Sequence, residues 1–184
     1  IRKQVTHIKC DDSHATGVTC ADGSHFEAAV IISDAHPVRT LELVDSPLLR
    51  PAYRRRIKSL RNTVGGFSVY LRFKENTVPY MNYNFYGYKG PSPWNWEHYT
   101  PEEWPKGYLY MHFCDEEHQQ YARSGVILSY MQMNDVEPWK GTQVGKRGEA
   151  YERFKTEHAE RLLDEMEKEF PGLRSRIAGY YTST

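Results

Sequence analysis

The chain has 184 residues, and its 24 basic side chains are balanced by 24 acidic ones. This balance argues against a nucleic-acid-binding role, because proteins that neutralise phosphates carry a basic excess. A length of 184 residues fits one domain, or one domain and part of another, and a hydrophobic content of 39% is enough to build a core. No apolar run approaches the roughly 20 residues that span a bilayer. Three cysteines without a CxxC pair fit a reducing compartment, so we expect a cytoplasmic location.

Residues 5–33 have the pattern of a three-stranded β-meander. We predict strands at 5–10, 16–20 and 25–33, with Asp22-Gly23 as the hairpin turn between the second and third strands. The end of the third strand, residues 28–32, is apolar throughout. Such a run is typical of a strand that is buried on both faces of a helix-covered sheet.

Two short helices are predicted next, at 37–43 and 51–61, each beginning at a proline. The second helix carries Arg54, Arg55, Arg56, Lys58 and Arg61. These cations indicate either a patch for anionic lipid or phosphate, or a solvated helix face, and the sequence favours the solvated face.

The rest of the chain predicts an antiparallel sheet and a long helix. Residues 66–74 alternate, with apolar Phe67, Val69, Leu71 and Phe73 on one side of a half-buried strand and Ser68, Tyr70 and Arg72 on the other. Further strands are expected at 107–113 and 125–133, separated by a helix at 115–123 that Asp115 would cap. Residues 147–169 form an amphipathic helix, which Pro171-Gly172 ends, and a short helix begins at Leu173. The predicted fold class is α+β.

No motif identifies a catalytic residue. The glycine-rich loop at 141–148 has the wrong spacing for a phosphate-binding loop, because three residues separate its first two glycines and Arg147 follows the lysine. His112 and His118 are six residues apart and lie across a predicted strand-to-helix boundary, so we predict no metal site.

Residues 78–110 are unusually rich in aromatic side chains. This segment could stack on sugars or enclose a long apolar ligand. It could also pack on its own domain, or on a part of the enzyme outside this sequence, and the balance slightly favours packing. The candidate substrate-binding residues are Phe67, Tyr80, Tyr83, Phe85, Tyr86, Trp94 and Trp96.

Several stretches together resemble one enzyme family. Val5-Thr6-His7-Ile8, Thr16-Gly17-Val18, Ala21-Asp22-Gly23, and Ala28–Ser33 followed by Ala35-His36-Pro37 are similar to the segment that precedes the substrate domain in FAD-dependent phytoene desaturase-type oxidoreductases. The carotenoid isomerase and retinol saturase branch is the most similar. Further similarities occur, in matching order, at Asn62-Thr63, Pro138-Trp139, 147–151 with Lys155, 170–173 and 180–184.

The resemblance implies a flavoenzyme in which a substrate domain is inserted into a Rossmann-like FAD-binding half. Residues 1–37 would be a β-meander of the FAD half, residues 38–178 the substrate-binding domain, and residues 179–184 the start of the return to the FAD half. Val5, Ala35, His36 and Pro37 match positions near the flavin. The implied reaction is hydride transfer between FAD and a carbon–carbon bond of a long polyene, or flavin-assisted isomerisation, with carotenoid- or retinoid-like substrates.

The chain departs from the family pattern because it contains neither GxGxxG nor a flavin-closing C-terminal segment. We therefore expect an internal segment of a larger enzyme, inactive alone and with little or no FAD binding. Apolar surface exposed by truncation would favour homo-oligomers, and a membrane-dissolved substrate would require peripheral membrane contact. The alternatives are an aromatic-surface carbohydrate- or lipid-binding module without catalysis, and a structural or protein-interaction domain.

Overall fold

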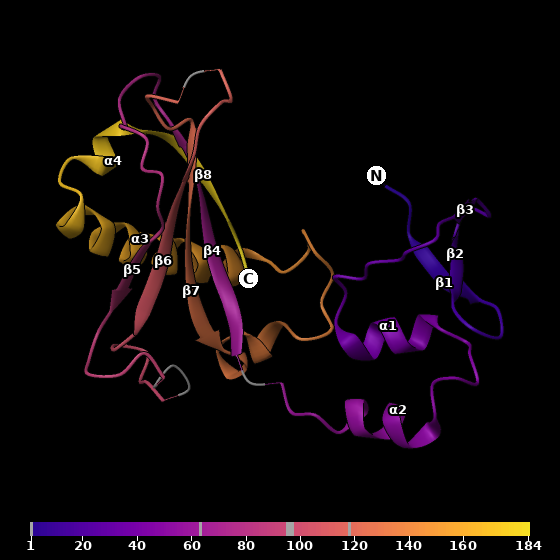
Figure 1. Cartoon of the computed structure of the whole chain (residues 1–184). Coiled ribbons are helices and arrows are strands. Elements are labelled where there is room, and N and C mark those ends of the chain that lie inside the picture. Colours follow the sequence, from indigo (N-terminus) through magenta and orange to yellow (C-terminus); the bar gives the residue numbers. More distant parts are fainter. Residues whose placement is uncertain (1, 63, 95–97, 118) are drawn as a thin grey trace. The chain divides into compact units, whose positions relative to one another are not determined.

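The computed structural model describes residues 2–62, 64–94, 98–117 and 119–184. The chain divides into two compact units, unit 1 (residues 1–62) and unit 2 (residues 63–184). Residues 38–62, which the sequence places with the substrate domain, belong to unit 1. Figure 1 shows the elements of each unit.

Unit 1 begins with the expected meander. Strands β1 (Val5–Cys10), β2 (Ala15–Cys20) and β3 (His25–Glu27) pair antiparallel in that order. The first turn is closed by the Asp11 carboxylate, which accepts hydrogen bonds from the backbone N–H groups of Ser13 and His14 at 2.7 and 2.8 Å. In the second turn Gly23 takes a φ of 82°, a conformation that glycine adopts without strain.

The predicted buried strand at 28–32 is wrong. Strand β3 ends at Glu27, and the following residues up to the start of helix α1 have no regular structure. Val30 is 75% exposed and Ile32 is 92% exposed. An apolar run becomes a buried strand only where neighbouring strands and helices cover it, and the described residues provide no such cover here.

Helices α1 (Pro37–Leu43) and α2 (Pro51–Lys58) complete unit 1, and α2 ends three residues earlier than predicted. His36 caps α1: its Nδ1 accepts a hydrogen bond from the Val38 N–H at 3.2 Å, and its Nε2 lies 2.9 Å from Asn62 Oδ1. The guanidinium of Arg54 donates to the backbone carbonyls of Leu41, Val44 and Leu49 at 2.6, 2.7 and 3.3 Å. Arg54 therefore joins α2 to the C-terminal end of α1, where carbonyls lack helical partners.

Unit 2 is built on the predicted antiparallel sheet. Its strands are β4 (Val64–Phe73), β5 (Phe85–Tyr88), β6 (Gly107–Phe113), β7 (Ser124–Gln132) and β8 (Ile177–Ser183). The spatial order is β5-β6-β7-β4-β8. Strand β4 thus lies between β7 and the last strand of the chain, and both neighbours pair with it antiparallel.

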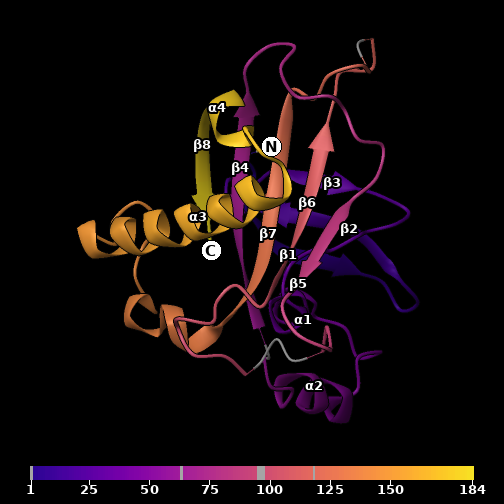
Figure 2. The same ribbon diagram turned by 90° about the vertical axis from the view of Figure 1, so that its left-hand side faces the viewer.

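The core of unit 2 lies between one face of this sheet and a helical layer. Helices α3 (Glu149–Glu169) and α4 (Leu173–Arg176) cover that face, and Figure 2 shows α3 crossing the strands. The apolar alternation of β4 supplies the sheet side of the core, and the stripe at Leu162, Leu163 and Met166 supplies the helix side. This arrangement confirms the α+β class, with the long amphipathic helix on an antiparallel sheet.

One prediction for unit 2 is wrong, and one strand was not predicted. The described residues of the predicted helix at 115–123 form turns and an isolated bridge, and the Asp115 carboxylate lies 2.7 Å from the Arg123 guanidinium instead of capping a helix. The aromatic segment 78–110 contains strand β5, which its pattern does not reveal. A 3₁₀-helix, η1 (Met133–Trp139), follows β7.

The edge strand β5 carries a glycine that its neighbour requires. Gly87 pairs with Tyr108 of β6, and a side chain at Gly87 would overlap the buried Tyr108 ring. Gly87 therefore allows the ring to lie against β5.

Among the described helices, none combines the length and the apolar character that a bilayer crossing needs.

Replacing Arg54 by lysine should destabilise unit 1 although the charge is kept. A lysine ammonium cannot reproduce the planar fork that reaches carbonyls of three residues. Hydrogen bonds to charged groups contribute about 1.5–3 kcal/mol each, so we expect the free energy of opening α1 to fall by about 2 kcal/mol. Amide hydrogen exchange of residues 40–44 measures this change. Arg55→Lys is the matched control and should leave the exchange unchanged; equal effects of the two variants would contradict the role of Arg54.

Candidate functional site

The second face of the five-stranded sheet is the candidate site. Cross-strand partners share a face, so the register places Tyr86, Leu109, Leu128 and Ser68 in one row on the side opposite the α3 core. A parallel row contains Met111, Val126, Tyr70 and Tyr181. The whole face of the sheet that carries these two rows is called the open face. Four of the strands place exposed aromatic side chains on the open face. These side chains, each at least 42% exposed, are Tyr86, Tyr88, Phe113, Tyr130 and Tyr181.

A groove of about 620 Å³ lies on the open face, where β4, β6, β7 and β8 run side by side. This volume is in the range of small-molecule sites. Aromatic, aliphatic and glycine positions supply most of its lining, with one arginine among them: Tyr70, Arg72, Phe113, Val126, Gly179 and Tyr181.

One wall of the groove is a pair of stacked tyrosines. The rings of Tyr70 and Tyr181 are nearly parallel, with an interplanar angle of 10° and centroids 4.5 Å apart. The Ser183 hydroxyl lies 3.3 Å from the Tyr70 hydroxyl. The pair presents a broad, rigid apolar surface, of which the Tyr181 side is 67% exposed.

Arg72 is the charged group of the groove. Its neighbours across the sheet are Ser124 and Gly179, neither of which carries a charge. Among the described residues, no carboxylate forms an ion pair with Arg72, whereas nearby Arg123 is paired with Asp115 and Glu75. The Arg72 guanidinium is therefore able to bind the polar end of a ligand that lies along the open face.

Two other hollows are less suited to an apolar ligand. One, of about 710 Å³, is lined mostly by charged and amide side chains of residues 75–76, 117 and 119–123. The other lies beside the 145–149 loop and the exposed first turns of α3, where Glu149, Glu152 and Arg153 dominate. Water competes well for the polar walls of the first hollow, and the second is more open to solvent than the groove, so neither offers the same desolvation to an apolar molecule.

Three of the predicted substrate-binding residues belong to the core on the α3 side. Phe67 is fully buried and meets Trp104 edge-to-face at 5.9 Å. Phe85 packs on Phe170 at 5.2 Å, and Tyr80 is partly buried against the same core. Within this structure these side chains stabilise the packing of the sheet against α3 and do not line the groove.

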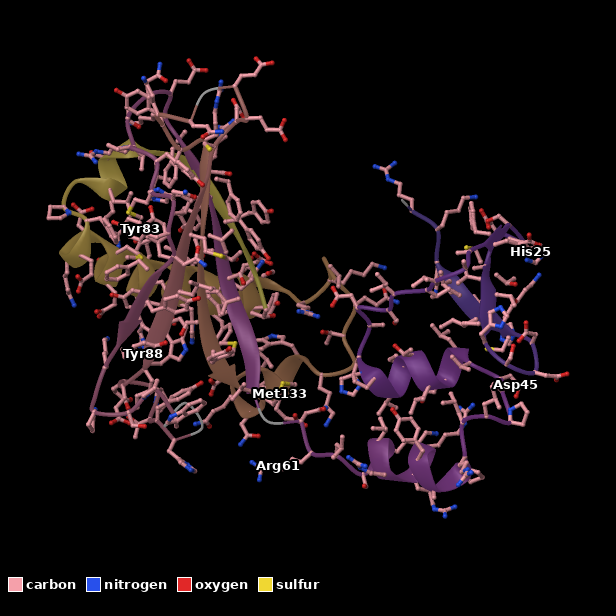
Figure 3. The ribbon with its side chains drawn as sticks, in the orientation of Figure 1. His25, Asp45, Arg61, Tyr83, Tyr88 and Met133 are labelled. Carbon is pink, nitrogen blue, oxygen red and sulfur yellow. The ribbon has the colours of Figure 1, made fainter. Side chains whose placement is uncertain are left out.

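The other predicted aromatics are separated from one another. Tyr86 lies on the open face, whereas Tyr83 and Trp94 are exposed in the connections on either side of β5. Figure 3 labels Tyr83 and Tyr88, which lie before and at the end of β5. Trp96 lies outside the described residues. The sequence did not identify Phe113, Val126 or Tyr181, and it placed Tyr70 and Arg72 on the second side of β4 without assigning that side a site.

The predicted flavin-contacting residues lie in unit 1. Ala35, His36 and Pro37 form the entry to α1, and both ring nitrogens of His36 are engaged by Val38 and Asn62. Val5 lies at the start of β1, opposite Cys20. Their role toward a flavin stays a prediction.

His112 is a buried titratable group among the core aromatics of unit 2. Its Nε2 lies 2.6 Å from the Tyr110 hydroxyl, and its Nδ1 lies 3.4 Å from the Met81 N–H. Burial lowers the pKa of His112 to about 4, opposed in part by the Pro79 backbone. His112 projects to the α3 side of the sheet, away from the groove, so its contribution is to packing. Among the described residues, no three His, Cys, Asp or Glu side chains converge as metal ligands would.

Comparison with protein-family models and with curated proteins found no match for this chain. The family resemblance therefore depends on the sequence stretches quoted above alone.

The buried imidazole makes unit 2 sensitive to acid. Because the folded pKa is about 4 and the ordinary value is 6.5, the unfolded chain takes up a proton between these pH values that the folded chain does not. The contribution of His112 is thus complete above pH 6.5 and is lost as the pH falls toward 4. Urea unfolding at several pH values measures this loss.

His112→Gln should lessen the fall in stability between pH 6.5 and 4, and His25→Gln, at an exposed position, should not. Burial also lowers the pKa of His158, so some acid sensitivity should remain in the His112 variant. An unchanged pH profile in His112→Gln would contradict the proton linkage at this ring.

Proposed function

We propose that unit 2 is the substrate-binding part of a flavin-dependent oxidoreductase or isomerase, and that its open face holds a long apolar polyene of the carotenoid or retinoid kind. The observation that carries the proposal is the open face itself, a surface of aromatic and aliphatic side chains from all five strands that helices α3 and α4 leave uncovered. A sheet face of this composition is unusual in water, where large exposed apolar patches mark binding sites.

The dimensions of the open face favour an extended ligand. Neighbouring strands are about 4.8 Å apart, so five strands give a surface roughly 19 Å across. Tyrosine rings offer contact area at little cost in conformational entropy, and a rigid conjugated chain also has little entropy to lose. Burying apolar area contributes about 25 cal/mol per Å², which makes a long polyene a better match than a compact polar molecule.

The residues of the groove would bind and orient the substrate. The Tyr70–Tyr181 pair supports the chain of the polyene, Phe113 and Val126 exclude water from it, and Arg72 fixes a polar end group. FAD, held by the other half of such an enzyme, would supply the hydride chemistry. The sequence has no GxGxxG turn for the flavin pyrophosphate, so we expect the 184-residue chain to bind the substrate and to bind FAD weakly or not at all.

The second candidate is a carbohydrate- or lipid-binding module without catalysis. The exposed tyrosines of the open face and exposed Trp94 favour it, because flat aromatic rings can stack on sugars as well as on polyenes. The two functions differ in ligand: a sugar module would bind soluble oligosaccharides and be indifferent to retinoids.

Polyene binding to the open face can be measured by titrating the whole chain with all-trans-retinol and following the quenching of tryptophan fluorescence. The double variant Phe113→Ser, Tyr181→Ser removes two exposed rings from the groove. We expect its affinity to fall at least tenfold, since losing two aromatic contacts costs more than about 1.4 kcal/mol. Phe26→Ser, on exposed strand β3 of unit 1, is the control and should bind retinol normally.

Two results would count against the proposed function. The first is retinol binding that the groove variant does not weaken. The second is saturable binding of oligosaccharides that the groove variant abolishes, which would support the carbohydrate module. Tight stoichiometric binding of FAD to this chain would contradict the expectation that the flavin site is absent.

A further inference from the structure

Residues 47–62, which contain helix α2 and its flanks, carry an unusual charge. The segment has six cations and no carboxylate: Arg50, Arg54, Arg55, Arg56, Lys58 and Arg61. Figure 3 labels Arg61 after α2, and Asp45 just before the segment. Because the whole chain has no net charge, this concentration of cations is a local feature.

Among the described residues of unit 1, Arg54 is the one of these six cations whose side chain forms hydrogen bonds within the unit. Arg54 is partly buried and donates to the backbone carbonyls of three residues. The other five are exposed, and none forms an ion pair with a carboxylate among the described residues. Elsewhere in the described chain, exposed cations such as Arg39, Lys140 and Arg153 do have acidic partners three or four residues away.

The helix dipole explains part of this pattern. Arg55, Arg56 and Lys58 lie in the last turn of α2, where cations interact favourably with the carbonyl end of a helix. That effect does not extend to Arg50, which precedes the helix. It also leaves unexplained the apolar side chains that the same segment exposes.

Three large apolar residues are exposed among these cations. Leu48 is 55% exposed, Tyr53 is 46% exposed and Leu60 is 59% exposed. Tyr53, Arg56 and Leu60 follow one another at spacings of three and four, which brings them to one side of α2 and its continuing turn. Nucleic-acid backbones offer no apolar partner to such leucines, whereas the boundary between lipid headgroups and acyl chains offers one beside its phosphates.

We propose that residues 48–61 form a docking surface for the anionic face of a phospholipid bilayer. The five exposed cations bind acidic headgroups, and Leu48, Tyr53 and Leu60 enter the headgroup–acyl boundary. Arg54 holds α2 on α1 and so presents these side chains outward. The surface lies in unit 1 and does not depend on the proposed function of unit 2, although it would bring the chain to the place where long apolar molecules dissolve.

The proposal is tested by sedimenting the whole chain with phosphatidylcholine vesicles, with and without about one third phosphatidylserine. We expect binding to the vesicles that contain phosphatidylserine, weak binding to phosphatidylcholine alone, and loss of binding as salt is raised. Each cation near the surface contributes roughly fivefold in affinity, so Arg55→Gln, Arg56→Gln should bind roughly 25-fold more weakly. Leu48→Ser, Leu60→Ser should also weaken binding.

The control pair is Lys140→Gln, Arg153→Gln, which removes the same charge from unit 2 and should bind like the parent chain. Circular dichroism checks that the Arg55, Arg56 variant stays folded. Three outcomes overturn the proposal: no binding to the acidic vesicles at low salt, equal binding to both vesicle types, or equal weakening by the control pair. Displacement of the chain from vesicles by a DNA duplex that binds it more tightly would also overturn it, in favour of a nucleic-acid partner.

Discussion

The two-residue alternation of β4 is the constraint on which unit 2 depends. The side of β4 that faces α3 is almost completely buried at Phe67, Val69 and Leu71. The alternate side chains of the strand must therefore point to the other face of the sheet. One helical layer can cover only one face of the sheet. The same strand therefore determines both the core and the open face, and a change of its register would exchange the two. The aromatic character of the open face then decides what that surface can bind.

Much of unit 2 could be predicted because its periodicities are strong and local. The alternation of apolar and polar residues in β4 and the apolar stripe of α3 can each be recognised within a short stretch of the sequence. The failures involve elements whose state is decided by distant partners. The run at 28–32 has strand composition but no covering layer, and Asp115, a good helix cap by type, binds the Arg123 guanidinium instead. Propensity gives way to tertiary context at both places.

The candidate site was predicted less well than the fold for a related reason. The sequence groups aromatic residues by segment, and so joins Phe85 to Tyr86. In a strand these neighbours face opposite ways, and only Tyr86 reaches the open face. The stacked pair is formed by Tyr70 of β4 and Tyr181 of β8, strands that are far apart in the sequence. A local sequence pattern does not predict which strands will be adjacent. A surface that combines residues of several strands therefore cannot be predicted until the strand order is known.

The close contact between Gly87 and the Tyr108 ring has a consequence for the edge of the sheet. Four-residue edge strands are prone to slide, because few hydrogen bonds oppose the movement. A slide of two residues would place Phe85 or Lys89 against the ring, where there is no room for a side chain. A slide of one would turn Tyr86 and Tyr88 toward α3. Gly87 thus fixes the register of β5 against β6. The register in turn determines that Tyr86 and Tyr88 of this edge strand lie on the open face.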